Sequence, residues 1–519
     1  MQDKGRVENS KKNIFWGILY RIILLICPFV LRTVMIYSMG VEYAGLGNLF
    51  NSVIQILSLT ELGMGTALVY FMYKPINDGD VYTVNALLNF YKKFYYIIGV
   101  IVLGISFLLL PMLPKLINGT YPSDINLYIL FVIYVLNTCA GYFFWAYKRA
   151  LLYASQRTDL ESKVSGVLIL AQYIVQICVL FLSKNYYLYI IVLPVFTVLT
   201  NLIVGIKIDK LFPQYKASGS IEPKLLANIK SKLSGIVLQK IGTVVLTSVD
   251  NIVVSAFLGL TVLTVYNNYI FVISALHSLL NITLISIIPS VGNSIVSESI
   301  EKNENDFKKF NLLYTVILSW CGTCLFVLYQ PFMRLWMKNV NDENMFLSFY
   351  MIIILVLYFY ALKIGDIVFA YNEADGLWDK RKYISIVSSF LNLFLNIASV
   401  KIIGLYGIVL SSIVSVFFIN IPADSYVLFK YYFKNLREWK KYIIHQIGYI
   451  VRLVIVSAFC YCICSFNLNN LIFDFIAKGL VCSIFSFFAY IIIYRKDKYF
   501  PVIVFFVKTK LLKLRINSL

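Results

Sequence analysis

Two arginines lie inside an apolar stretch near the N-terminus, at residues 14–39. Arg21 and Arg32 are eleven residues apart, and eleven residues make three turns of an α-helix, so both side chains share one face. A charged group within an apolar helix is expensive in a bilayer, which makes it a candidate functional group. We expect this face to meet an anion; the alternatives are snorkelling to a membrane surface and a structural ion pair.

Two lysines in later apolar stretches complete a cationic set. Lys240 lies in 233–258 and Lys363 in 346–371. Lys363 is three residues before Asp366, the spacing of an ion pair within one helix, so self-neutralisation competes with substrate contact there. The residues predicted to contact the substrate are Arg21, Arg32, Lys240 and Lys363.

Three acids in the same kind of surroundings are candidates for ion coupling or charge balance: Glu61, Asp250 and Asp366. A carboxylate such as Glu61 could bind a coupling H⁺ or Na⁺, or balance the arginines, whereas Asp250 could cap or pair structurally. No nucleotide-binding loop, activated nucleophile or paired carboxylates of a soluble domain occur, so no catalytic residue is predicted. Nine cysteines within apolar runs and two histidines in all indicate no metal site and no cofactor.

The elements that must position these residues are membrane-spanning helices. Of the 519 residues, 60% are hydrophobic and 14% are charged, and apolar runs of about 20 residues recur along the whole chain. The formal net charge of +20 lies in the breaks between runs, which argues against a nucleic-acid partner. The predicted spans are 14–39, 44–73, 84–110, 125–147, 164–183, 186–206, 233–258, 265–292, 310–332, 346–371, 383–400, 404–429, 446–465 and 470–494.

The distribution of cations supports about fourteen spans with both termini cytoplasmic. With that orientation, 35 of the 46 Lys and Arg residues fall on the cytoplasmic side and five in outer loops, as the positive-inside rule requires. The first span is long, contains Arg21 and Arg32, and lacks a cleavage site after it, so we expect it to remain in the mature protein. The predicted location is the bacterial cytoplasmic (inner) membrane, with lipids around a multi-pass chain.

Three landmarks recur at an offset of 219 or 220 residues: Gly40 with Gly259, Pro111 with Pro331, and Ala154 with Ala374. Such duplication is typical of transporters. The fold expected is all-α, with two pseudo-symmetric six-helix lobes around a central cavity and two extra C-terminal helices. The predicted divisions are a tail at 1–13, an N-lobe at 14–206, a cytoplasmic linker at 207–232, a C-lobe at 233–429, an interfacial amphipathic segment at 430–445, two spans in 446–494 and a basic tail at 495–519.

Four motifs add a resemblance to a known family. They are MGVEYAGLGNLFNSVIQILSLTELGMGTALVYFMYKPI at 39–76, LLYASQRTDL at 151–160, SVDNIVVSAFLGLTVLTVYNNY at 248–269 and PFMRLWM at 331–337. In this order they resemble the polysaccharide transporter branch, the Wzx-type flippases, of the multidrug/oligosaccharidyl-lipid/polysaccharide (MOP) superfamily. The resemblance implies a cavity lined by spans 1, 2, 7 and 8, where Arg21, Arg32, Glu61 and Lys240 lie.

The resemblance also implies a function. The chain would flip undecaprenyl-pyrophosphate-linked oligosaccharide repeat units for O-antigen or capsule from the inner to the outer leaflet by alternating access. Polymerase and glycosyltransferases of the same pathway are candidate partners. A lipid II flippase is an alternative, although span 2 has no Arg or Lys before Lys74. A MATE-like multidrug antiporter is another, and a membrane polymerase is disfavoured by the short outer loops.

Overall fold

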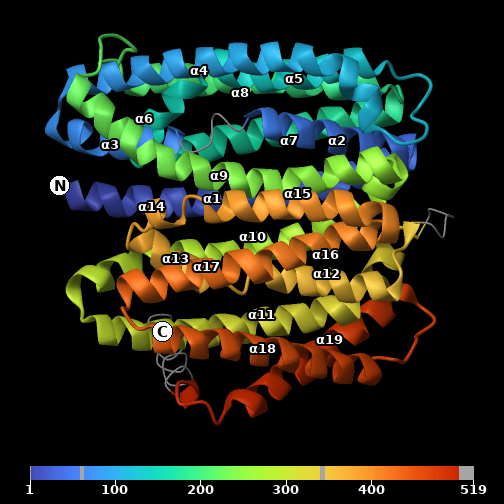
Figure 1. The fold of residues 1–519 in the computed structure, drawn as a ribbon. Helices are drawn as coiled ribbons and strands as arrows, with labels where there is room; N and C mark the ends of the chain where they lie inside the picture. Colours follow the sequence, from blue (N-terminus) through green and yellow to red (C-terminus); the bar gives the residue numbers. More distant parts are fainter. Residues whose placement is uncertain (1, 59–63, 339–344, 502–519) are drawn as a thin grey trace. The chain divides into compact units, whose positions relative to one another are not determined.

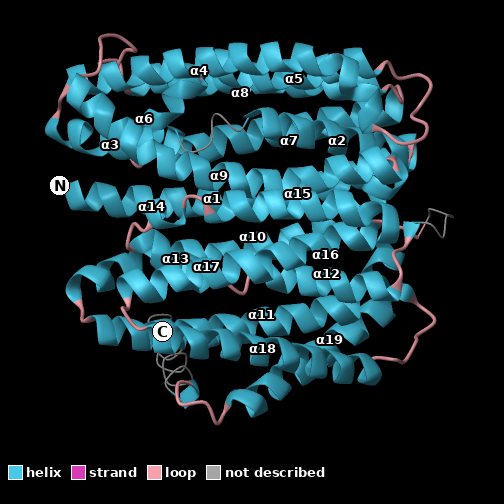
Figure 2. Ribbon diagram, viewed as in Figure 1, coloured by secondary structure: helices cyan, strands magenta, loops and turns pink. Residues whose placement is uncertain are grey.

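The computed structural model describes residues 2–58, 64–338 and 345–501, and all regular elements in these ranges are helical (Figures 1 and 2). Within them, eleven helices are long and apolar enough to cross a membrane, or twelve if a bent pair is one span. The chain therefore has the make-up of a multi-pass membrane protein. The expected count of fourteen and the orientation of the termini stay predictions.

The contacts divide the chain into two compact units, one ending at Thr264 and the other beginning at Val265. In unit 1, α1 packs on α7, α7 on α8, α5 on α8, and α2 on α9. Its helices are α1 (Gln2–Met39), α2 (Val41–Leu57), α3 (Met64–Asp78), α4 (Val81–Leu109), α5 (Leu127–Phe143), α6 (Arg149–Ala154), α7 (Thr158–Leu182), α8 (Tyr186–Leu211) and α9 (Pro223–Leu258).

In unit 2, α15 packs on α16, and the last two helices, α18 and α19, both pack on α11. Thr323 of α11 is hydrogen-bonded to Ser457 of α18 at 3.1 Å and to Tyr490 of α19 at 2.8 Å. The unit contains most of α10 (Leu260–Ser297), then α11 (Ile300–Trp336), α12 (Phe349–Ala361), α13 (Asp366–Ala374), α14 (Trp378–Arg381), α15 (Ile384–Ile403), α16 (Leu405–Ser415), α17 (Ile421–Val427), α18 (Leu436–Ile463) and α19 (Leu471–Tyr494).

Two of the landmark pairs have matching backbone structure. Gly40 joins α1 to α2 with φ 111° and ψ 172°, and Gly259 joins α9 to α10 with φ 90° and ψ 174°. A positive φ of this kind favours glycine. Ala154 ends α6 and Ala374 ends α13, and each of these short helices follows a break in an apolar span. These features are what the predicted duplication requires.

The third pair differs, since Pro111 lies in the 3₁₀ turn Leu110–Leu116 that follows α4, whereas Pro331 lies inside α11. The predicted span 44–73 is observed as α2 and α3, on either side of residues 59–63, which lie outside the described residues.

Polar contacts join α2 to α9 within unit 1. The Asn251 amide donates to the Ser52 hydroxyl at 2.8 Å, and the Ser248 hydroxyl donates to Gln55 at 2.9 Å. Near the glycine junctions, a Cβ added to Gly45 would lie 2.6 Å from the Leu260 carbonyl oxygen. Small and polar residues of α2 therefore lie at its contacts with α9 and with the start of α10, as is common where membrane helices pack.

Candidate functional site

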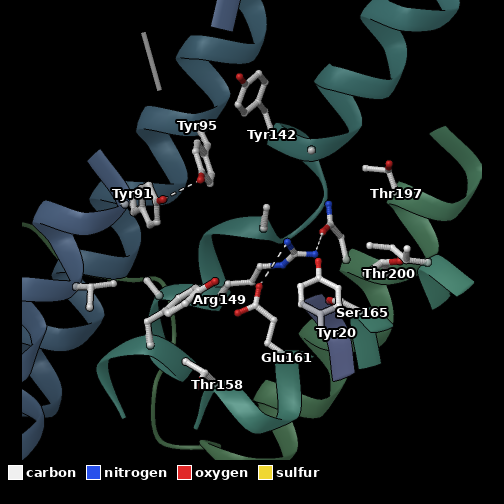
Figure 3. Close-up of a pocket in the computed structure, with 18 of the residues that line it drawn as sticks. Tyr20, Tyr91, Tyr95, Tyr142, Arg149, Thr158, Glu161, Ser165, Thr197 and Thr200 are labelled. Carbon is white, nitrogen blue, oxygen red and sulfur yellow. Dashed lines mark hydrogen bonds and ion pairs between the residues drawn. The ribbon is translucent and has the colours of Figure 1, made fainter. Parts of the chain in front are cut away.

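Unit 1 contains a cavity of about 1120 Å³ lined by α1 and by α3 to α8 (Figure 3). Arg149 and Glu161 are the charged side chains among its lining residues. Most other lining side chains are polar: Asn13, Tyr20, Ser58, Tyr73, Tyr91, Tyr95, Asn137, Thr138, Tyr142, Tyr153, Gln156, Thr158, Ser165, Gln172, Thr197, Thr200 and Asn201. A cavity of this size, in which polar groups converge on a lining that also has much apolar surface, is the default hypothesis for a binding site.

A break between α5 and α6 brings Arg149 to the cavity wall. The two segments meet at 47°, and Trp145 at the break has φ 55°, in the left-handed region. Trp145 packs on Gly205 of α8, where an added Cβ would lie 2.8 Å from the indole ring. The close packing of an aromatic ring on a glycine thus stabilises the bend, after which Arg149 begins α6.

The three nitrogen atoms of the Arg149 guanidinium have different surroundings. Its Nη1 lies 3.7 Å from Glu161 Oε1, and its Nη2 donates to Asn201 Oδ1 at 2.8 Å. Its Nε is buried and has no hydrogen-bond partner among the described residues. Figure 3 shows Arg149 and Glu161 facing each other, with the Tyr20 ring beside them. The guanidinium is therefore loosely held and retains donors for a ligand.

Tyrosine side chains form much of the rest of the wall. The hydroxyls of Tyr91 and Tyr95 are 2.7 Å apart, and their ring centroids are 4.4 Å apart. A Cβ on Gly65 of α3 would lie 2.8 Å from the Tyr91 hydroxyl. Tyrosine combines an apolar ring face with a hydroxyl that both donates and accepts, so this wall suits a ligand with apolar faces and many hydroxyls.

The two arginines predicted from the first span lie in α1 and do not line this cavity. Arg21 is exposed, and Arg32 is half-buried. Arg32 donates from Nη1 to Asn48 Oδ1 at 3.2 Å and from Nη2 to the Thr264 carbonyl at 3.3 Å. Arg32 thus joins α1 to α2 and to the start of α10, and the anion-binding role of both arginines stays a prediction.

For three other predicted residues, Glu61, Lys240 and Asp250, the structure gives less detail. Glu61 lies outside the described residues, and Lys240 lies in α9 but its side chain is outside the described part. Asp250, also in α9, is 2% exposed. Their roles in substrate binding and coupling stay predictions.

An ion pair was one of the two alternatives for Lys363 and Asp366 in the tenth span, and the structure shows this contact. Lys363 Nζ lies 3.1 Å from Asp366 Oδ2 and donates to Asn281 Oδ1 at 2.6 Å. Asp366 also accepts from the Tyr314 hydroxyl at 2.5 Å. The pair sits at the break between α12 and α13, a position that spacing alone does not reveal. The substrate and coupling roles of both residues stay predictions.

Sequence reasoning missed Arg149 and Glu161, because both were assigned to a cytoplasmic loop. One signal was available: Glu161 follows Ala154 by seven residues, as Arg381 follows Ala374. Charged groups thus recur at the duplicated landmark with opposite sign. In the described part of the chain, no group of three or more His, Cys, Asp and Glu side chains is arranged to hold a metal ion.

Comparison with known proteins gives a clear result at the level of the fold. Neither a protein-family model nor a curated protein matches the sequence. A solved structure of the lipid II flippase MurJ in an inward closed conformation matches with a TM-score of 0.64 and 18% identity, covering 94% of this chain and 99% of that one. The chain therefore shares its fold with this flippase.

Two MATE transporters are similar to this chain at the level of the fold. An inward-facing MATE transporter of the MOP superfamily matches with a TM-score of 0.58 and 15% identity, over 80% of this chain and 95% of that one. A point mutant of the Vibrio cholerae MATE transporter VcmN matches with a TM-score of 0.54 and 13% identity, over 86% of this chain and 99% of that one. These neighbours are transporters and a flippase, not enzymes. The fold therefore agrees with the one that the resemblance implied, and the superfamily and its Wzx-type branch stay predictions.

Proposed function

We propose that this protein is a flippase that moves undecaprenyl-pyrophosphate-linked oligosaccharide repeat units from the inner to the outer leaflet of the bacterial cytoplasmic membrane, by alternating access. The observation that carries the proposal is the hydroxyl- and amide-lined cavity with Arg149 in unit 1. A MOP-type fold that matches a lipid II flippase over 94% of this chain supports it. Fourteen spans and two cytoplasmic termini belong to the same proposal.

The cations of the first and seventh spans have a place in this mechanism. Arg21, Arg32 and Lys240 would bind the pyrophosphate, because a phosphate attracts cations strongly where water is scarce. Lys363 is held by Asp366 and Asn281, so it would reach a phosphate only if that pair opened. Glu61 and Asp250 remain candidates for binding H⁺ or Na⁺.

A MATE-like antiporter is the second candidate, because Glu161 gives the cavity an acid and MATE transporters share the fold. An acid favours cationic ligands, whereas Arg149 beside it favours anionic ones. Deletion distinguishes the two: loss of a drug antiporter would raise sensitivity to cationic drugs and leave surface polysaccharide intact.

The test is deletion of the gene followed by analysis of lipid-linked oligosaccharides. We expect a complete, unpolymerised repeat unit on the lipid carrier to accumulate on the cytoplasmic face. Completed units on the outer face would point to a polymerase and overturn the proposal. Accumulation of lipid II instead would identify the other flippase activity of this fold.

Variants then test the cationic set. Arg21→Ala should abolish export while the protein stays in the membrane at normal levels. It is more informative than Arg32→Ala, because Arg32 also makes contacts that join helices. Arg437→Ala, at an exposed position in the first turn of α18, is the matched control. Full export by the Arg21→Ala, Arg32→Ala double variant would remove these arginines from the mechanism.

A further inference from the structure

Each unit has an arginine–carboxylate pair beside its broken span. In unit 1, Arg149 of α6 faces Glu161 of α7. In unit 2, Arg381 of α14 contacts Glu373 of α13 and Asp424 of α17. The landmark alanines place Glu161 and Arg381 at corresponding positions, whereas Arg149 corresponds to Phe369 and not to either acid that contacts Arg381. Their differences indicate what each pair does.

The pair in unit 2 is closed. The Arg381 side chain is 3% exposed, its Nε lies 2.7 Å from Asp424 Oδ1, and its Nη1 lies 3.4 Å from Glu373 Oε1. The guanidinium also lies 5.2 Å from the centroid of the Phe369 ring. An arginine that is buried between two carboxylates and an aromatic ring holds helices together and has little capacity for a ligand.

The pair in unit 1 is open. The Arg149 side chain is 31% exposed, its contact with Glu161 is 3.7 Å long, and its Nε is buried without a partner among the described residues. A guanidinium has five N–H donors, and a carboxylate can accept two of them in parallel. A purely structural pair would gain by closing as the Arg381 pair does. Nη1 and Nη2 each carry two N–H groups, and each has one polar neighbour, Glu161 and Asn201 respectively, so Arg149 keeps N–H donors for a carboxylate from a ligand.

The charge of the site selects the kind of anion. Arg149 and Glu161 together are neutral, and they are the charged side chains of the cavity lining. A pyrophosphate would bring two or more negative charges close to Glu161, and repulsion between like charges would oppose it. A single carboxylate brings one charge and matches the planar fork of the guanidinium.

The remaining walls select the kind of molecule. Rings such as Tyr20, Tyr95 and Tyr142 offer apolar faces, and the amides and hydroxyls around them can donate and accept hydrogen bonds. At about 1120 Å³, the cavity is larger than the roughly 300–1,000 Å³ that suffices for drug-sized ligands. It therefore has room for more than one sugar ring.

From these observations we infer that the cavity of unit 1 binds the oligosaccharide portion of the substrate, and that Arg149 binds the carboxylate of an acidic sugar of the hexuronic acid type. Glu161 accepts hydrogen bonds from sugar hydroxyls beside it. The inference rests on the proposed function and names the part of the substrate that enters unit 1.

Two disaccharides that differ in one group provide the test. Cellobiuronic acid carries a carboxylate where cellobiose carries a hydroxymethyl group. Purified full-length protein in lipid nanodiscs would be titrated with each sugar up to millimolar concentration, with saturation-transfer difference NMR as the readout. We expect cellobiuronic acid to bind about tenfold more tightly, the effect of about one charge-assisted hydrogen bond.

Variants show whether Arg149 causes the preference. Arg149→Gln should bind both sugars equally and about as well as the original protein binds cellobiose, whereas Arg437→Gln should keep the tenfold preference. If Arg149→Gln does not fold, Arg149→Lys replaces it and should keep only part of the preference, because an ammonium lacks the fork. Absence of binding, equal binding of the two sugars by the original protein, or an unchanged preference in the Arg149 variant overturns the inference.

The deletion strain separates this inference from the proposed function. Accumulated lipid-linked oligosaccharide together with no preference for cellobiuronic acid would leave the flippase standing and remove the acidic-sugar site. A clear preference without any accumulation would keep the sugar site and remove the flippase.

Discussion

Replacing Arg381 by glutamine should destabilise unit 2 strongly, and the structure gives the size of the effect. Glutamine is too short to reach both Glu373 and Asp424, so two carboxylates lose their cation. Breaking a buried ion pair by removing one partner costs about 3–5 kcal/mol. The two acids are each 24% exposed, and water near them places the expected loss at the lower end, about 3 kcal/mol.

The matched control is Arg149→Gln in unit 1. Its contact with Glu161 is longer, at 3.7 Å, and the arginine is already 31% exposed. A glutamine there can still donate to Asn201. The expected loss in the free energy of unfolding is about 1 kcal/mol or less, as for a partly exposed ion pair.

The assay is thermal unfolding of each full-length variant in the same detergent, followed by the monomer peak in size-exclusion chromatography. Arg381→Gln should lower the apparent melting temperature by several degrees, while Arg149→Gln should lower it slightly. Adding Asp424→Asn to Arg381→Gln should restore part of the loss, because one uncompensated charge is removed. Equal losses for Arg149→Gln and Arg381→Gln would refute the distinction between an open pair and a closed pair.

Three further changes test other contacts. Gly45→Ala should push α2 from the start of α10, since its Cβ would lie 2.6 Å from a carbonyl oxygen. We expect this overpacking to lower the free energy of unfolding by about 1–3 kcal/mol. The measurement is thermal unfolding, with Gly104→Ala as the control because a Cβ at the exposed Gly104 meets no other atom within 4 Å. Asn251→Ala should lower the free energy of unfolding by about 1 kcal/mol, because it removes the hydrogen bond to Ser52 at 2.8 Å. The measurement is thermal unfolding, and an unchanged melting temperature would contradict this contribution. Asp366→Asn should lower the free energy of unfolding by about 3 kcal/mol, because Lys363 is 8% exposed and would lose its counter-ion. If the Lys363→Met, Asp366→Leu double variant is no more stable than Asp366→Asn, the unpaired lysine does not cause the loss of stability.

Much of the architecture could be predicted from local sequence. Apolar runs long enough to span a bilayer lead directly to helices, because a lipid-exposed chain must satisfy its backbone hydrogen bonds internally. The Lys363–Asp366 pair followed from a spacing of three residues, and this contact is observed at 3.1 Å. Gly40 and Gly259 were noted as corresponding positions, and both have a positive φ at a helix junction.

The breaks inside two apolar spans could not be predicted in this way. Hydropathy averages over a window, so it does not distinguish a straight helix from one that bends by 47° after Phe143. The bend depends on Trp145 packing against Gly205, a residue that is distant in sequence. Arg149 and Glu161, beside the break in unit 1, were accordingly assigned to a loop.

The sequence by itself determined that this chain is a helical membrane protein, because composition and the length of apolar runs decide which solvent surrounds the helices. Only the tertiary structure decided which charges are available for a ligand. Arg149 and Arg381 flank corresponding landmarks in the sequence, yet one lines a cavity and the other is 3% exposed between two carboxylates. Burial and pairing depend on contacts between residues far apart in the chain, and residue type and spacing do not encode such contacts.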